Sequence, residues 1–342
     1  YEEKNRAMDN PFRVFNETSR KYFFKNHPYG QQTILGSVEH LKTPSLSKMK
    51  EYYNKYYVPN NMHLLIAGDF DKRDVKKLIK AKFGKLKKGA DVEQLDIAED
   101  DFSGREVVDL AITPYRVARF GYRTVKPNHE DAVVLDLISN IFSNSSKTGL
   151  LNKLNNENKV LGSYSTTGLG GTDHGGFGFG FVPKDDTQSF EDGENLILKE
   201  IDKVKSGEFN EDLLQSIKLN MSMDHETRME SVDGRTWLIM STILDNVPWE
   251  EIKNYPNKVN SVTKQKVVEV ANKYFTDNYL IVRSDKGDNK KVKLEKPPFK
   301  PVEPQNSESN SEYADMLNDI EPKKIDPRFV DFKKDVKVED IG

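Results

Sequence analysis

The stretch KYYVPNN at residues 55–61 decides how the chain is organised, because a shortened copy, KYFTDN, returns at residues 273–278. Each copy follows an apolar pattern of helical spacing. Each also leads into an apolar run that is typical of a strand, at residues 62–67 and 279–284. Two copies of one helix–turn–strand unit indicate a duplicated domain. Far fewer residues precede the first copy, so we expect the chain to begin inside a domain whose front half it lacks.

Composition excludes several classes of function. The 342 residues are 36% hydrophobic and 31% charged, which is typical of a globular protein with about two domains. The net charge of -3 gives no electrostatic reason to bind nucleic acid or an anionic membrane. No cysteine is present, which excludes disulfides, thiolate nucleophiles and cysteine-ligated zinc. No apolar run approaches the length of a membrane span, so no membrane insertion is expected.

The first domain is expected to cover residues 1–95. Helical spacing of aromatic residues predicts a helix over residues 1–30, ended by PYG at residues 28–30. Ser45 or Ser47 is expected to cap a second helix. A strand at residues 62–67 and a helix at residues 72–83 follow, before a polar, acidic linker.

The second domain is expected to be complete and to cover residues 100–285. The predicted strands are at residues 107–113, 116–125, 162–167, 175–182 and 279–284, and the predicted helices include residues 149–155, 190–206 and 210–231. Asn128 and Asn210 are expected to act as helix caps. This order favours an α+β fold with a mostly antiparallel sheet and helices grouped on one face. Residues 286–342 are rich in Pro, Ser and Asn and predict a linker.

Several short motifs together resemble one known family. They are EE at residues 2–3, DNP at 9–11, HPYG at 27–30 and VPNNM at 58–62, then TGLL at 148–151, GSYS at 162–165 and GEFNEDL at 207–213. In order and spacing they resemble the insulinase/pitrilysin family of zinc metallopeptidases, whose hallmark is an inverted His-x-x-Glu-His motif. The resemblance spans about residues 1–285. It implies two related α+β domains, of which the first is incomplete here.

The resemblance also implies a zinc centre in the parent protein. In the family, the His-x-x-Glu-His helix supplies two zinc ligands and a general base, and a Glu from a later helix is the third ligand. By that spacing Glu3 resembles the third ligand, and Glu2 is the close alternative. No His-x-x-Glu-His occurs in this chain, and no two of its six histidines are four residues apart on one helical face. We therefore expect no catalytic residue, no complete zinc site and no activity in the chain alone.

Two other motifs invite a functional interpretation but are better explained structurally. His174 follows Asp173 in a glycine-rich segment, which suggests metal or acid–base chemistry, but a turn between strands is the simpler explanation. His27, before Pro28, is expected to be a turn residue that packs near Tyr29. The glycines at residues 168–180 match no phosphate-binding pattern and predict tight turns and close packing.

The function implied by the resemblance belongs to the parent protein. Two double-domain halves of such a peptidase close into a chamber around a peptide or an unfolded segment, and residues 286–342 would lead toward a missing C-terminal half. Peptide bonds would be hydrolysed in the chamber with zinc as cofactor. One alternative is a family member without the zinc motif that serves as a partner subunit or scaffold. Another is an interaction module that never binds zinc. The composition and the resemblance favour an exported bacterial protein.

Overall fold

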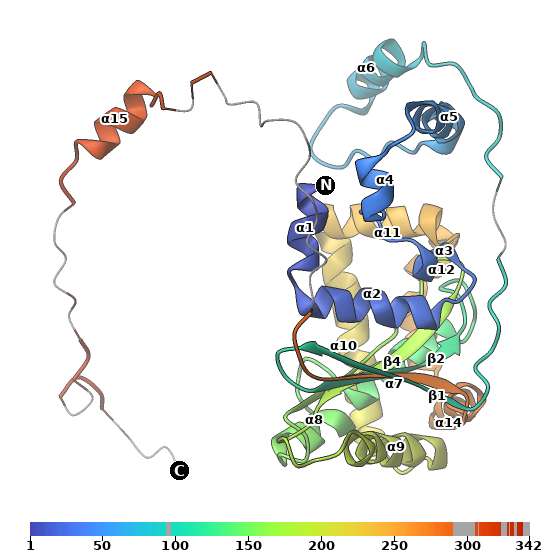
Figure 1. Ribbon diagram of the computed structural model, residues 1–342. Coiled ribbons are helices and arrows are strands. Elements are labelled where there is room, and N and C mark those ends of the chain that lie inside the picture. The colour runs from blue at the N-terminus through green and yellow to red at the C-terminus, as the bar shows by residue number, and fades with distance from the viewer. Residues whose placement is uncertain are drawn as a thin grey trace. The chain divides into compact units, whose positions relative to one another are not determined.

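The computed structural model describes residues 1–93, 97–289, 305–306, 308–322, 327, 329–331 and 334–337 (Figure 1). The chain divides into two compact units, residues 1–291 and residues 292–342. In the second unit a short helix, α15 (Glu312–Asn318), begins after Ser311, whose side chain accepts a hydrogen bond from the Ala314 N–H. Part of the expected linker, including residues 290–304, lies outside the described residues.

A five-stranded sheet forms the centre of the first unit. Its strands are β1 (Arg105–Thr113), β2 (Val117–Thr124), β3 (Gly162–Thr166), β4 (Gly175–Val182) and β5 (Tyr279–Lys286), in the order β1-β5-β2-β4-β3. The pairs β5–β2, β2–β4 and β4–β3 are antiparallel, and only β1 and β5 run parallel. The predicted α+β class and the mostly antiparallel sheet are confirmed.

The main core lies between this sheet and a group of helices. They include α7 (Ala132–Phe142), α9 (Phe190–Ser206) and α14 (Lys264–Tyr274). The alternation of Gly and Phe along β4 explains how the sheet is covered on both faces. Phe177, Phe179 and Phe181 are buried in the core, whereas a Cβ at Gly178 would lie 2.5 Å from Leu169 on the other face. The expected close approach to β4 is therefore made by side chains such as Leu169 and Tyr164.

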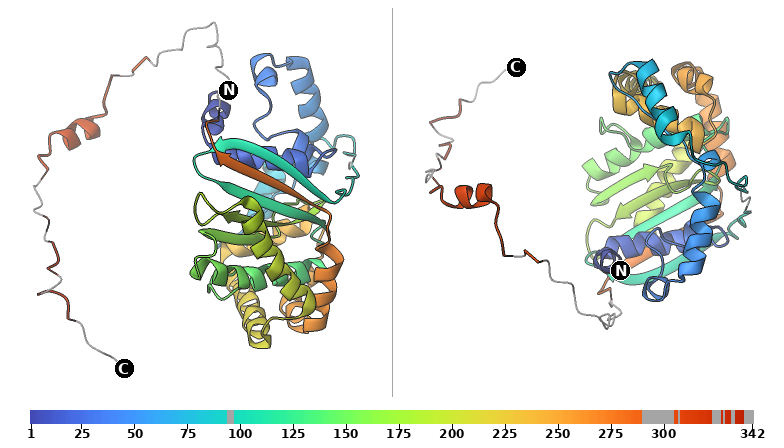
Figure 2. Two further views of the ribbon diagram at one scale, coloured as in Figure 1. Left: turned by 60° about the horizontal axis from the view of Figure 1, so that its bottom comes forward. Right: turned by 90° about the horizontal axis from the view of Figure 1, so that it is seen from above.

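The opposite face of the sheet is covered by α2 (Pro11–Phe23), from the N-terminal segment (Figures 1 and 2). Phe15, Phe23 and Phe24 pack with Leu280 and Val282 of β5 in a second apolar cluster. In Figure 1 the blue helix α2 lies on one side of the sheet, and α8 and α9 lie on the other. Burial of this aromatic surface stabilises the attachment of the N-terminal segment to the sheet.

The prediction of one helix over residues 1–30 is wrong. The structure has α1 (Glu2–Met8), α2 and α3 (Pro28–Gln31) instead. Pro11 has no N–H to continue α1, and Asn10 caps α2 by accepting hydrogen bonds from the Phe12 and Arg13 N–H groups at 3.0 and 3.3 Å. PYG therefore begins α3 rather than ending a long helix.

The repeated motif has the same local structure in both copies up to its turn. The helices α5 (Leu46–Tyr56) and α14 are each 11 residues long, and Ser45 and Thr263 cap them. Their C-capping residues, Tyr57 and Phe275, have φ values of -92° and -93°. Of the two predicted caps, Ser45 is correct.

The two copies differ after the turn, and the predicted strand at residues 62–67 is wrong. The turn η1 (Pro59–Asn61) leads into extended backbone, and Met62, Leu64 and Ile66 are exposed. A strand needs a neighbour to satisfy its N–H and C=O groups, and within described residues 1–93 no segment pairs with residues 62–67. The helix that follows, α6 (Lys72–Phe83), has the predicted bounds.

The predicted helices at residues 149–155 and 210–231 are confirmed as α8 (Leu150–Asn156) and α10 (Glu211–Glu230), and α11 (Val232–Leu244) follows α10. Three further short helices were not predicted: α4 (Val38–Lys42), α12 (Trp249–Lys253) and α13 (Tyr255–Ser261). Asn210 caps α10 as predicted, by accepting from the Asp212 N–H at 2.8 Å. Asn128 does not cap α7, which begins after Asp131, because the chain makes a further turn at residues 127–130.

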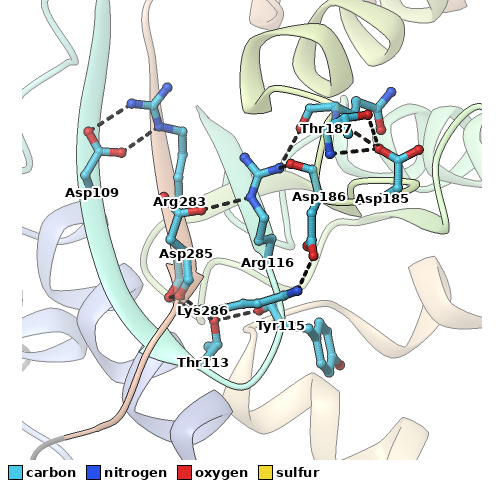
Figure 3. A network of polar contacts seen from close by, with 12 residues as sticks. Asp109, Thr113, Tyr115, Arg116, Asp185, Asp186, Thr187, Arg283, Asp285 and Lys286 are labelled. Atoms are coloured by element: carbon cyan, nitrogen blue, oxygen red, sulfur yellow. Dashed lines mark hydrogen bonds and ion pairs between the residues drawn. The ribbon is translucent and has the colours of Figure 1, made fainter.

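A network of ion pairs fixes the end of β5 against its neighbours (Figure 3). Arg283 donates two hydrogen bonds to Asp109 of β1, at 2.7 and 2.9 Å. Arg116 donates to Asp285 at 2.8 Å and to the Gln188 carbonyl, in the loop before α9, at 2.6 Å. Single pairs of this exposed kind contribute little to stability, so the network mainly sets where these segments lie relative to one another.

Candidate functional site

The predicted zinc ligand, Glu3, lies in the first turn of α1 and is exposed. The buried residue of this helix is Lys4, whose Nζ contacts Glu17 Oε2 at 3.4 Å and Thr33 Oγ1 at 3.2 Å. In the described part of the chain, no three His, Cys, Asp or Glu side chains come together to hold a metal ion. Glu3 could supply one zinc ligand, but the described residues do not fit a complete zinc site.

His27 and His174 lie together where the N-terminal segment meets the glycine-rich turn. Their ring centroids are 5.1 Å apart, and His27 Nδ1 accepts a hydrogen bond from the Tyr29 N–H at 3.2 Å. The Tyr29 hydroxyl lies 3.3 Å from Asp173 Oδ2, and a Cβ at Gly171 would be 2.5 Å from the Tyr29 ring. The expected packing of His27 near Tyr29 is confirmed. The cluster joins the N-terminal segment to the glycine-rich turn, and Gly171 permits the close approach of the Tyr29 ring.

Glu99 organises this contact, although no sequence pattern identified it. Its carboxylate accepts hydrogen bonds from the backbone N–H groups of Lys25 and Asn26, at 3.0 and 2.8 Å, and from that of His27. Arg123 of β2 donates to the same carboxylate at 3.2 Å. Since these donors lie far from Glu99 in the sequence, only the folded chain brings them together.

The His27 contact predicts that stability falls in mildly acidic solution. Burial lowers the pKa of His27, the charge of His174 lowers it further, and Asp173 and Glu99 only partly oppose this. Its folded-state pKa therefore lies below its unfolded value of about 6.5. The contribution of neutral His27 to the free energy of unfolding is complete above pH 6.5. It is lost as the pH falls below that value, because His27 in the unfolded chain then binds the proton more tightly than in the folded chain.

We expect His27→Asn to lose less stability than the wild type between pH 7.5 and pH 5, as measured by urea unfolding. Asparagine retains a side-chain acceptor for capping α3. The matched control is His40→Asn, since His40 is exposed. Identical pH dependence in the wild type and His27→Asn would contradict this assignment.

A cavity of about 890 Å³ lies between α7, α10, α11, α12 and α13. Three residues of α7 line it at positions i, i+3 and i+4: Asp136, Ser139 and Asn140. Facing them from α10 are His225 and Arg228. Residues at this spacing lie on one face of a helix. On α7, however, they are a carboxylate, a hydroxyl and an amide, and none is an imidazole of the kind that the His-x-x-Glu-His motif supplies to zinc. The sequence did not reveal this cavity because its walls come from five helices, including α12 through Ile252.

This chain is similar in sequence to a known peptidase family and to a curated zinc protease. The family model described as the peptidase M16 inactive domain matches residues 45–221, just over half of the chain. The zinc protease PqqE of Helicobacter pylori is 24% identical over 272 residues, which are 78% of this chain and 59% of that protein. The chain thus spans less than two thirds of the length of this curated relative.

Solved structures show the same architecture. The first half of the periplasmic protease PqqL from Escherichia coli is similar with a TM-score of 0.68 and 17% identity, over 83% of this chain and 64% of that one. A peptidase M16 inactive domain from Pseudomonas fluorescens is similar with a TM-score of 0.70 and 15% identity, over 83% and 68% of the two chains. At these identities the likeness shows the fold alone. None of the helices in the described ranges has the length and apolar character needed to cross a membrane.

The match over more than half of the sequence confirms the resemblance to insulinase-type peptidases, and this chain belongs to the peptidase M16 inactive-domain family.

Proposed function

We propose that this chain is part of a zinc metalloendopeptidase and that it encloses the peptide substrate rather than cutting it. The observation that carries the proposal is the family match over residues 45–221, together with a relative named as a zinc protease. In this proposal residues 100–285 are a complete second domain that forms a chamber wall. Residues 286–342 lead toward a further half of the parent protein.

Residues 1–95 would be the back half of a catalytic-type domain. Two observations support this. First, α5 and its turn repeat the local structure of α14. Second, the apolar run at residues 62–67 is extended and exposed, as expected for a strand whose neighbours belong to another segment.

Glu3 would supply one ligand to a zinc ion whose other ligands lie in a His-x-x-Glu-His helix of the parent. Zinc at such a site activates a water molecule for hydrolysis. Because the described residues do not make a zinc site by themselves, we assign no step of the reaction to them. Their proposed roles are to bind and orient an extended peptide and to exclude water around it. Export from the cytoplasm is part of the proposal, since the similar PqqL structure is that of a periplasmic protease.

A partner subunit or scaffold without activity is the second candidate. The matching model is described as an inactive domain, and the part of the chain that the structure describes holds no metal-binding cluster. The parent would then contain no zinc, although residues 1–285 would fold in the same way.

Zinc content and peptide hydrolysis distinguish these functions. We expect the chain of residues 1–342 alone to bind no zinc and to leave a fluorogenic peptide library uncleaved. The full-length parent should contain zinc and cleave the library, and a chelator should abolish the cleavage. If the parent contains no zinc, the peptidase proposal is rejected and the scaffold function is retained. Chelator-sensitive cleavage by the isolated chain would show that its residues hold more of the site than we propose.

A further inference from the structure

The cavity between α7, α10, α11, α12 and α13 has charged groups that form no ion pair within the described residues. Asp136, Asp224 and Asp245 line it, together with one cation, Arg228. Over the described ranges, no ion pair or hydrogen bond holds the side chains of Asp224, Asp245 or Arg228. Asp136 accepts one hydrogen bond, from Thr167 Oγ1 at 2.8 Å, and this uses only its Oδ1 atom. The cavity therefore carries more negative than positive charge on unpaired groups.

The carboxyl groups in the cavity are in environments that favour a cationic partner. Burial raises the pKa of Asp136, and the hydrogen bond from Thr167 and the charge of Arg228 only partly oppose this. Burial also raises the pKa of Asp245. A carboxylate held away from water without a counter-ion is costly, and a bound cation offsets that cost. Burial lowers the pKa of His225, which favours the neutral imidazole, so His225 does not compete with a bound cation for the carboxylates.

Aromatic and apolar surfaces complete the cavity. Tyr255 stacks on His225 with ring centroids 5.1 Å apart, and Trp237 of α11 lines the cavity while 68% exposed. Faces of Trp and Tyr attract planar cations and also cover the methylene groups behind them. The volume of about 890 Å³ lies in the range of about 300–1,000 Å³ that is usual for ligand sites.

A second cavity of about 390 Å³ adjoins the first. Both are lined by Pro127, Asp136, Thr167 and Asp245, and the second reaches the glycine-rich turn at Gly168. Asp136 and Asp245 thus stand where the two cavities adjoin. An extended peptide could lie along both and place one side chain between these carboxylates.

We propose that the two cavities form a subsite for a peptide segment and that the larger one accepts an arginine side chain. The guanidinium fits because it is planar, donates up to two parallel hydrogen bonds to a carboxylate and stacks on aromatic rings. The inference deepens the proposed function by naming a substrate class, and it takes from that function only that the ligand is a peptide. It assigns to the inactive domain the task of selecting peptides with a basic residue.

Calorimetric titration of the chain of residues 1–342 tests the subsite without any hydrolysis. The probes are Ac-Gly-Arg-Gly-NH2 and its citrulline counterpart, in which a neutral urea replaces the guanidinium at nearly the same shape. At pH 7.5 we expect the arginine peptide to bind about tenfold more tightly or better, the order expected when a charge-assisted hydrogen bond is lost. Equal affinities, no measurable binding, or tighter binding of Ac-Gly-Glu-Gly-NH2 would overturn the proposal.

Variants identify the groups responsible. Asp136→Asn combined with Asp245→Asn should reduce the arginine peptide to the affinity of the citrulline peptide. The matched control is Asp233→Asn, in the first turn of α11, because Asp233 does not line the cavity. Arg228→Gln should strengthen binding of the arginine peptide, since it removes the competing cation.

Circular dichroism and thermal unfolding verify that each variant is folded. If the double variant unfolds, Asp245→Asn alone and Arg228→Gln still test the proposal, because they are expected to shift the affinity for the arginine peptide in opposite directions. Unchanged affinity in both would overturn the proposal. Failure of the subsite would leave the zinc and hydrolysis tests of the full-length parent unaffected, so the two proposals fail separately.

Discussion

Replacing Glu3 by Gln in the full-length parent is expected to remove most of the zinc and to lower peptidase activity more than about 100-fold. Mutation of a residue that only hydrogen-bonds to a metal ligand typically lowers metal affinity or activity about 10–100-fold. Mutation of a ligand itself should lower them more. An amide keeps the size of the side chain but loses the charge that favours Zn²⁺. Metal analysis and hydrolysis of a peptide library measure the two effects independently.

Glu2→Gln is the matched control for this substitution. Both residues are exposed in the first turn of α1, and neighbouring positions on a helix point in directions about 100° apart. Because the buried contact of α1 is made by Lys4, neither change should unfold the helix. If zinc content is equal in Glu3→Gln and the wild type, Glu3 is not a ligand. If only Glu2→Gln loses zinc, the alternative position is correct.

Phe179→Ala is expected to destabilise the chain by about 3–5 kcal/mol, the usual cost of removing a fully buried phenylalanine ring. The Phe179 ring is fully buried at the centre of the core. Its ring centroid lies 4.9 Å from that of Phe142, 5.1 Å from those of Phe120 and Phe177, and 5.9 Å from that of Phe275. Truncation leaves a cavity bordered on several sides by rings that cannot all move into it.

Urea unfolding of the isolated chain measures this effect. The control is Phe83→Ala in α6, because Phe83 is 52% exposed and should change stability by less than about 0.5 kcal/mol. A loss for Phe179→Ala no larger than that for the control would show that the sheet and its helices do not pack as described.

The candidate site was only partly accessible to sequence reasoning. The order of motifs identified the family and singled out Glu3. Glu99 and Glu194 gave no signal, because the groups they bind are distant in the chain: Glu194 of α9 accepts from Arg105 at 2.8 and 2.6 Å and from the Tyr279 hydroxyl at 2.7 Å. The cavity around Asp136 was also missed, since a carboxylate within an apolar helix becomes meaningful only when its neighbours are known.

The sequence by itself determined several of the longer helices, although not the division of residues 1–31 into three helices. The predicted bounds of α6 and α9 and the caps Ser45 and Asn210 are correct, because helical hydrogen bonds and caps join residues only a few positions apart. The sequence also predicted the five strands of the sheet closely, but tertiary structure decided which apolar runs became strands. The two copies of the repeated motif turn alike, but residues 279–286 form β5 between β1 and β2, whereas residues 62–67 remain unpaired in the described chain. A strand obtains its hydrogen bonds from distant segments, so its existence depends on which neighbours the fold provides.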